Sequence, residues 1–148
     1  MTPVNAPPTN VTQAVPFFTV RDIGASVRFY VEGLGFSIKH RWDTDGRLRW
    51  CWLQRGGAAL MVQNRVRDDG SVGEEPARVG GSFSVCFICK DALALHAEFT
   101  GHGLVTEEPF VGNHMWVVGL SDPDGYRIYF ESPTDVPEET WLSEWPRR

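Results

Sequence analysis

The chain has 148 residues, a formal net charge of −5, and fractions of apolar and charged residues that are typical of a soluble globular protein. No basic stripe offsets the negative charge, so we do not expect a nucleic-acid partner. No apolar run approaches the roughly 20 residues that span a bilayer, and the start of the chain has no pattern of a secretion signal. We therefore expect no membrane partner and a cytoplasmic location.

The three cysteines do not indicate a disulfide framework. Cys86 and Cys89 have C-x-x-C spacing, but they stand in an apolar run, 83–89, that predicts a strand. Residues three apart on a strand point to opposite faces, so the two thiols cannot hold one metal ion. We expect reduced, buried thiols that act as small apolar side chains.

A pattern that occurs twice is the most informative feature of the sequence. Residues 17–36 predict a strand, a turn and a helix that ends at a pair of glycines, and residues 85–104 repeat this order. The elements predicted for the first half are, in chain order, a strand at 15–20, a helix capped by Asp22 or Ser26, and strands at 36–42, 48–54 and 58–63. Those of the second half are a strand at 83–89, a helix at 92–100, and strands near 104–107, at 115–120 and at 126–131, the last two joined by the turn 121–125.

The repeat predicts an α+β fold in which two modules of curved mixed sheets form a cleft, a natural place for a small molecule. The expected segments are a flexible tail (1–13), a first module (14–63), a linker loop rich in glycine, proline and charge (64–81), a second module (82–132) and a C-terminal tail (133–148). A short helix in that last tail carries Trp141 and Trp145, which we expect to pack on a module or on a partner subunit.

The segments VRDIGASVRFYVEGLGF (20–36) and DPDGYRIY (122–129) resemble the vicinal-oxygen-chelate superfamily. This group includes glyoxalase I, the extradiol dioxygenases, fosfomycin-resistance enzymes and bleomycin-resistance proteins. The resemblance extends over nearly the whole chain after the first tail, and it implies two βαβββ modules. It also implies that metal ligands, where members of the family have them, come from the first and fourth strands of each module.

The positions that the resemblance assigns to metal ligands carry Val15, Ala59, Phe83 and Tyr129 in this chain. The first three side chains have no donor atom, and a single tyrosine does not hold a divalent ion. We therefore expect no metal and no other cofactor.

Alternation along the strands predicts which side chains face the cleft. The predicted ligand-binding residues combine an aromatic and apolar surface with a few polar groups: Phe17, Trp50, Trp52, Met61, Gln63, Phe83, Phe87, Trp116, Arg127, Tyr129 and Glu131. Such a surface binds flat or amphipathic ligands by stacking. The alternative, in which the tryptophans fill a core or a dimer contact, stays open.

No catalytic residue follows from the sequence, although His114, Glu131 and Tyr129 are candidates, with His114 as a general acid or base. A relocated metal site of His40, His114 and Glu131 is a further alternative. We expect His96 and His102 on the surface, on the helix side of the sheet.

The resemblance is greatest to the bleomycin-resistance branch, which implies a metal-independent binding protein. It would hold an amphipathic or aromatic ligand, a cationic antibiotic among the options, in a groove between the two subunits of a homodimer. The alternatives are a glyoxalase- or dioxygenase-type enzyme with a non-standard ligand set, a metal-free acid–base enzyme, and an interaction protein. Whether the chain is an enzyme stays open at this point.

Overall fold

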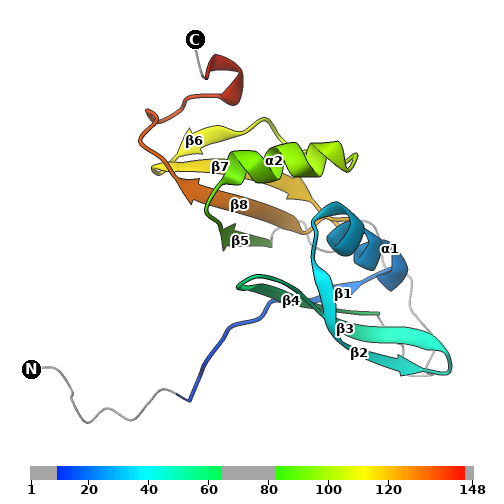
Figure 1. The fold of residues 1–148 in the computed structure, drawn as a ribbon. Helices are drawn as coiled ribbons and strands as arrows, with labels where there is room; N and C mark the ends of the chain where they lie inside the picture. The colour runs from blue at the N-terminus through cyan, green and yellow to red at the C-terminus, as the bar shows by residue number, and fades with distance from the viewer. Residues whose placement is uncertain (1–9, 65–82, 146–148) are drawn as a thin grey trace, which may run out of the picture.

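Two sheets of four strands organise the chain, and each is accompanied by one helical segment (Figure 1). The computed structural model describes residues 10–64 and 83–145. The predicted linker and most of the predicted N-terminal tail therefore lie outside the described residues. Within them, the α+β fold of two βαβββ modules is confirmed.

The first sheet has the strand order β1-β4-β3-β2. Its elements are β1 (Phe17–Val20), α1 (Ile23–Val27), a π-helical continuation η1 (Arg28–Gly33), β2 (Ser37–Thr44), β3 (Arg47–Arg55) and β4 (Ala58–Asn64). Of the two predicted caps for α1, the structure uses Asp22, whose carboxylate accepts a hydrogen bond of 3.1 Å from the backbone N–H of Ala25. Strand β1 runs parallel to β4, and the other neighbours are antiparallel.

The second sheet repeats this arrangement with the order β5-β8-β7-β6. Its elements are β5 (Ser84–Ile88), α2 (Ala92–Gly101), β6 (Phe110–Gly112), β7 (Met115–Ser121) and β8 (Arg127–Pro133), followed by a short 3-10 helix, η2 (Leu142–Glu144). The strand predicted near 104–107 is wrong, because the tight turn at Asn113 and His114 pairs residues 110–112 with β7 instead. The described part of the C-terminal tail returns to β6, where the ring of Trp141 lies 5.2 Å from that of Phe110.

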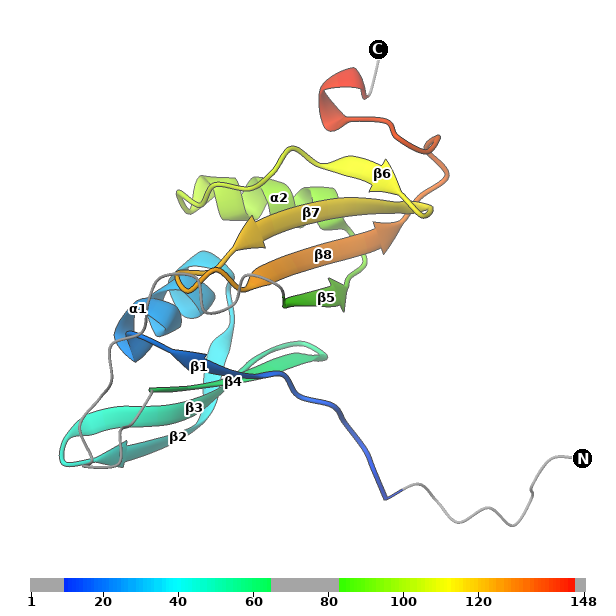
Figure 2. The same cartoon turned by 180° about the vertical axis from the view of Figure 1, so that it is seen from behind.

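The turn between β7 and β8 forms as predicted. The Asp122 carboxylate accepts hydrogen bonds from the backbone N–H groups of Asp124 (2.8 Å) and Tyr126 (3.0 Å), and Gly125 takes a positive φ of 88°. Figure 2 shows α1 packed beside this turn, between the two sheets. The two modules share one hydrophobic core, to which both sheets contribute one face.

No helix in the described part of the chain is both long enough and apolar enough to span a membrane.

Candidate functional site

The first sheet carries an aromatic surface on the side opposite the core. Trp50 pairs with Trp42 on one neighbouring strand and with Gln63 on the other, while Trp52 pairs with Met61. The intervening residues of β3 are buried in the core, so these partners share the outer side. We call this surface the aromatic face and define it by Phe17, Trp42, Trp50, Trp52, Met61 and Gln63.

The aromatic face brings together the ligand-binding residues predicted in the first module. Strand β1 adds Phe17, which pairs with Met61. Phe17 is 50% exposed and Trp42 is 60% exposed, which is high for large apolar side chains. Sequence reasoning missed Trp42, because regular alternation along β2 from the core-packed Ile38 would turn it inward. The register shift between Ile38 and His40 places Trp42 on the outer side instead.

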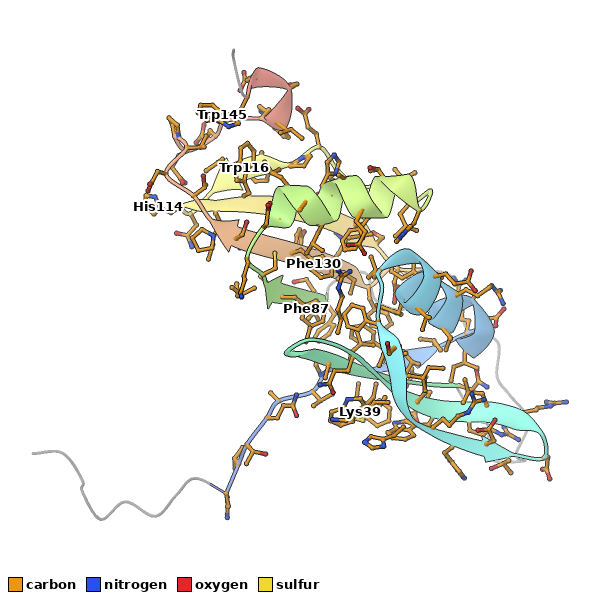
Figure 3. The ribbon with its side chains drawn as sticks, in the orientation of Figure 1. Lys39, Phe87, His114, Trp116, Phe130 and Trp145 are labelled. Atoms are coloured by element: carbon orange, nitrogen blue, oxygen red, sulfur yellow. The ribbon has the colours of Figure 1, made fainter. Side chains whose placement is uncertain are left out.

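Polar groups order the centre of the aromatic face. The indole N–H of Trp52 donates to the side-chain oxygen of Gln54 at 2.8 Å, and the Gln63 amide donates to the Thr19 hydroxyl at 3.3 Å. Lys39 Nζ lies 6.0 Å from the centre of the Trp52 ring, and the His40 ring meets the same indole edge-on at 5.9 Å. Figure 3 shows Lys39 at the first sheet, on the side away from α1.

The second sheet has a more polar surface, also on the side opposite the core. Arg127, Tyr129 and Glu131 alternate along β8, and we call the surface that they define the polar face. The Arg127 guanidinium lies 5.3 Å from the centre of the Tyr129 ring and 2.6 Å from a carboxylate oxygen of Glu107. A Cβ atom at Gly119 would come within 2.8 Å of the Tyr129 ring, so the glycine lets this ring lie on the strand.

Phe83, Phe87 and Trp116 do not lie on the polar face, so the prediction that they share one side of the sheet with Tyr129 is wrong. Phe83 and Phe87 instead line the cavity beside residues 13–16. The parallel register of β5 and β8 places Cys86 beside Tyr129 and Phe87 beside the buried Phe130. Cys86, Ile88, Met115 and Val117 take the outward positions. The core-facing parity is taken by Trp116, which is buried, by Phe87, which is half-buried, and by Phe83, which is 48% exposed.

Aromatic contacts link Phe83 and Phe87 to rings on the core side of the sheets. The Phe87 ring lies 5.8 Å from that of Phe36 and 5.5 Å from that of Phe130, as Figure 3 also shows for the labelled pair. Phe83 contacts Phe18 at 5.7 Å, across the contact between the modules. Trp116 is only 6% exposed.

The cysteines are free thiols, as expected, but only Cys51 is buried. Burial raises the pKa of the Cys51 thiol to about 11, which keeps it protonated near neutral pH. Cys86 is exposed on the polar face, and Cys89 packs against the core.

The histidines do not converge with Glu131. His114 stands in the β6–β7 turn with its side chain 86% exposed, and its neighbouring carboxylate is that of Glu138, at 3.8 Å. His40 belongs to the aromatic face of the other module. No group of three or more His, Cys, Asp or Glu within residues 10–64 and 83–145 could hold a metal ion, so the set of His40, His114 and Glu131 is wrong.

The two other histidines make hydrogen bonds close to the helices. His96 Nδ1 lies 3.0 Å from the Thr106 hydroxyl, and His102 Nδ1 lies 2.9 Å from the carbonyl oxygen of Gly33 in the other module. His102 is exposed, as expected, and His96 is half-buried.

The metal-ligand positions of the family do not fit a metal ion in this chain. Val15, Ala59 and Phe83 offer no donor atom, and the Phe83 ring is turned into the contact between the modules. Tyr129 packs with Arg127. A divalent ion needs several converging ligands, so these residues cannot supply the site.

The aromatic face and the polar face do not enclose a cleft within one chain, since each is turned away from the shared core. A cavity of about 740 Å³ lies instead where the β3–β4 turn (Arg55–Ala58) meets β5 and α2, with Phe36, Phe87 and Phe130 among its lining residues. A second cavity, of about 460 Å³, lies beside the extended segment 13–16.

The fold and its two outer faces define a class of small two-module α+β proteins with paired βαβββ units. The sequence model of the Glyoxalase/Bleomycin resistance protein/Dioxygenase superfamily matches residues 12–130. The chain belongs to this superfamily, and the resemblance stated from the sequence is confirmed.

Solved structures of antibiotic-binding proteins have the same fold. The chain is similar to the bleomycin-binding protein of bleomycin-producing Streptomyces verticillus in complex with copper(II)-bleomycin, at 21% identity and a TM-score of 0.62, with 82% of this chain and 96% of that chain covered. For the antibiotic binding protein TnmS3 of Streptomyces sp. CB03234 the identity is 20%, the TM-score 0.62 and the coverage 85% and 99%. For the bleomycin resistance determinant encoded on transposon Tn5 the identity is 22% and the TM-score 0.65, with 85% of this chain and 100% of that chain covered. No curated protein matches the sequence.

Proposed function

We propose that the protein binds an amphipathic or aromatic small molecule on its aromatic face, without the help of a metal ion. The observation that carries this proposal is the exposure of large aromatic side chains, among them Phe17 and Trp42, on the side of the sheet opposite the core. Contiguous apolar patches on soluble proteins mark binding surfaces. The bleomycin-binding protein and TnmS3, which have this fold, are described as antibiotic binders, which supports an antibiotic-like ligand here.

We further propose that a second copy of the chain completes the site. One chain turns its aromatic face and its polar face away from each other, so a single copy offers two half-sites. In a symmetric homodimer the aromatic face of one copy can oppose the polar face of its partner. The family resemblance implies a groove between two subunits. Indole rings would then stack on the ligand, while Arg127, Tyr129 and Glu131 of the partner orient its polar groups.

Binding is tested by titrating a panel of aromatic compounds, bleomycin included, and by following tryptophan fluorescence and thermal stability. We expect saturable quenching and a higher melting temperature for the ligand that fits, because binding to the native state stabilises it. Trp52→Leu should lower the affinity about tenfold or more, as expected when a stacking partner of about 1.4 kcal/mol is lost. Trp145→Leu, which changes a tryptophan outside both faces, should leave the affinity unchanged.

Metal independence is tested on the same ligand after treatment with EDTA. The donor-free side chains at the family's ligand positions support unchanged affinity. Loss of binding after EDTA, with recovery on addition of Zn²⁺, Mn²⁺, Ni²⁺ or Fe²⁺, would contradict the proposal. We also propose a cytoplasmic location, which fractionation of the source cells would test.

A further inference from the structure

We propose that Lys39 and His40 recognise an anionic group on the ligand, so that the site selects aromatic molecules that carry a carboxylate, sulfonate or phosphate. This inference rests on the proposed function and narrows its ligand class. It is carried by an irregularity in β2, by the charges of the aromatic face, and by the hydrogen bonds that Trp52 already makes.

Strand β2 contains a bulge at the place where it meets Trp52. Ile38 pairs with Leu53 and His40 pairs with Trp52, which leaves Lys39 as an extra residue opposite the same partner. In a regular strand the side chains of Lys39 and His40 would point to opposite faces. The bulge brings both to one indole, with Lys39 Nζ at 6.0 Å and the His40 ring at 5.9 Å.

Within residues 10–64 and 83–145, the strands around Trp52 offer no negative charge to these two side chains. The strand register places the following residues on this side, and none of them is acidic: Phe17, Thr19, Ser37, His40, Trp42, Trp50, Trp52, Gln54, Ala59, Met61 and Gln63. The acidic residue nearest along β2, Asp43, is bound by the Arg41 guanidinium at 2.8 and 3.0 Å. Among the described residues, Lys39 takes part in no ion pair.

The polar atoms of Trp52 are also already used within the strand. Its indole N–H donates to Gln54, whose amide donates in turn to the carbonyl oxygen of Gly56 at 3.2 Å. The ring surface is therefore what Trp52 offers to a ligand, and Lys39 and His40 supply the donors beside it. An aromatic ring stacked there would place an attached anion next to an ammonium group, which forms strong charge-assisted hydrogen bonds.

Two fluorescent probes that differ by one anionic group test this inference. The probes are 8-anilinonaphthalene-1-sulfonate and the uncharged N-phenyl-1-naphthylamine, which has the same aromatic rings without the sulfonate. We expect the wild-type dimer to bind the sulfonate probe about tenfold more tightly, which corresponds to about 1.4 kcal/mol. Lys39→Gln should remove most of this preference, His40→Gln part of it, and Lys39→Arg should retain it.

Matched variants separate this inference from the proposed function. Lys90→Gln removes one exposed lysine charge outside the aromatic face, and it should leave both affinities unchanged. The inference would be overturned if Lys39→Gln weakened the binding of both probes equally, or if Lys90→Gln weakened the sulfonate probe as much as Lys39→Gln does. A loss of binding of both probes in Trp52→Leu would still support the aromatic site. Absence of saturable binding for both probes would contradict the proposed function, and the inference with it.

Discussion

At the scale of single residues, Tyr30 and Asp122 form the most deeply buried polar contact between the two modules. The Tyr30 hydroxyl donates a hydrogen bond of 2.7 Å to the Asp122 carboxylate, and the two residues are 0% and 5% exposed. Burial raises the pKa of Asp122 above its ordinary value, and the hydrogen bonds from Tyr30 and from the backbone of Asp124 and Tyr126 oppose this shift. Burial also raises the pKa of Tyr30, with a further contribution from the charge of Asp122, so the tyrosine remains a donor.

Tyr30→Phe should lower the free energy of unfolding near pH 7 by about 1–3 kcal/mol, because a buried carboxylate loses a donor. The raised pKa of folded Asp122 means that its protonated form favours folding, and that this stability is lost as the pH rises through the folded pKa. Removal of the Tyr30 hydrogen bond raises that pKa further. The destabilisation should therefore be smaller near pH 4 than near pH 7, and urea unfolding at both pH values measures it.

The control for this variant is Tyr129→Phe, which removes a hydroxyl on the polar face. Among the described residues, only Arg127 contacts this hydroxyl, at 3.5 Å. We expect a change below about 0.5 kcal/mol at either pH. A loss in Tyr30→Phe that is the same at both pH values would show that the hydroxyl does not act through the Asp122 carboxylate.

At the scale of elements, Arg55 at the end of β3 connects three segments. Its guanidinium donates to both carboxylate oxygens of Glu98 on α2, at 2.7 and 2.9 Å, and to the carbonyl oxygen of Leu34 after η1, at 2.7 Å. A Cβ atom at Gly35 would lie 2.6 Å from the guanidinium, and this glycine has a φ of 80°. A glycine is therefore required where Arg55 passes.

Arg55→Lys should lower the free energy of unfolding by about 1 kcal/mol, since an ammonium group cannot reproduce this planar fork. The side chains of Arg55 and Glu98 are 34% and 32% exposed, so solvent screening limits this loss of stability. A double-mutant cycle with Glu98→Gln, measured by urea unfolding, should give a coupling energy of about 0.5–1 kcal/mol. The control is Arg28→Lys, at an exposed residue of η1, which should change the free energy of unfolding little. A coupling energy of zero in the cycle would contradict the stabilising role of the contact between Arg55 and Glu98.

The strand pattern placed most of the predicted residues of the first sheet on one side, as found, but it did so only in part for the second sheet. Packing explains the difference. In β3 the small or aliphatic residues Cys51 and Leu53 alternate with the tryptophans and are buried in the core. Trp50 and Trp52 therefore belong to the outer side. In β5 and β7 both parities contain apolar side chains, such as Phe87 beside Ile88 and Trp116 beside Val117. Only the contact with the core decides which of them turns inward.

Two features of the site could not be predicted from the sequence. The bulge at Lys39 has no mark in the local residues, because it depends on how β2 registers against β3. The repeat predicts two similar sheets, but it does not say that they meet through their core faces, which sends the aromatic and polar faces outward. That outcome depends on contacts between residues distant in sequence, such as Tyr30 with Asp122.

At the scale of the whole molecule, the proposed dimer is supported by apolar side chains that are exposed on both faces. Trp42 is 60% exposed on the aromatic face, and Ile88 is 64% exposed on the edge strand of the polar face. Such side chains favour association when they are contiguous with a larger apolar surface. A symmetric dimer would bury both at once, because each copy contributes both faces.

Trp42→Glu and Ile88→Glu should each shift the protein from a dimer to a folded monomer of 16.6 kDa. A carboxylate buried without a partner in an apolar contact costs several kcal/mol, whereas the same group on a monomer surface stays in water. Size-exclusion chromatography with light scattering measures the mass, and circular dichroism checks that the fold is retained. Val105→Glu is the matched control, because Val105 is 89% exposed in the connection between α2 and β6, outside both faces, and this variant should remain dimeric. A monomeric wild type would contradict the shared site. A protein that stays dimeric in both Trp42→Glu and Ile88→Glu would contradict it as well. In either case the aromatic face and the polar face would have no means of meeting around one ligand.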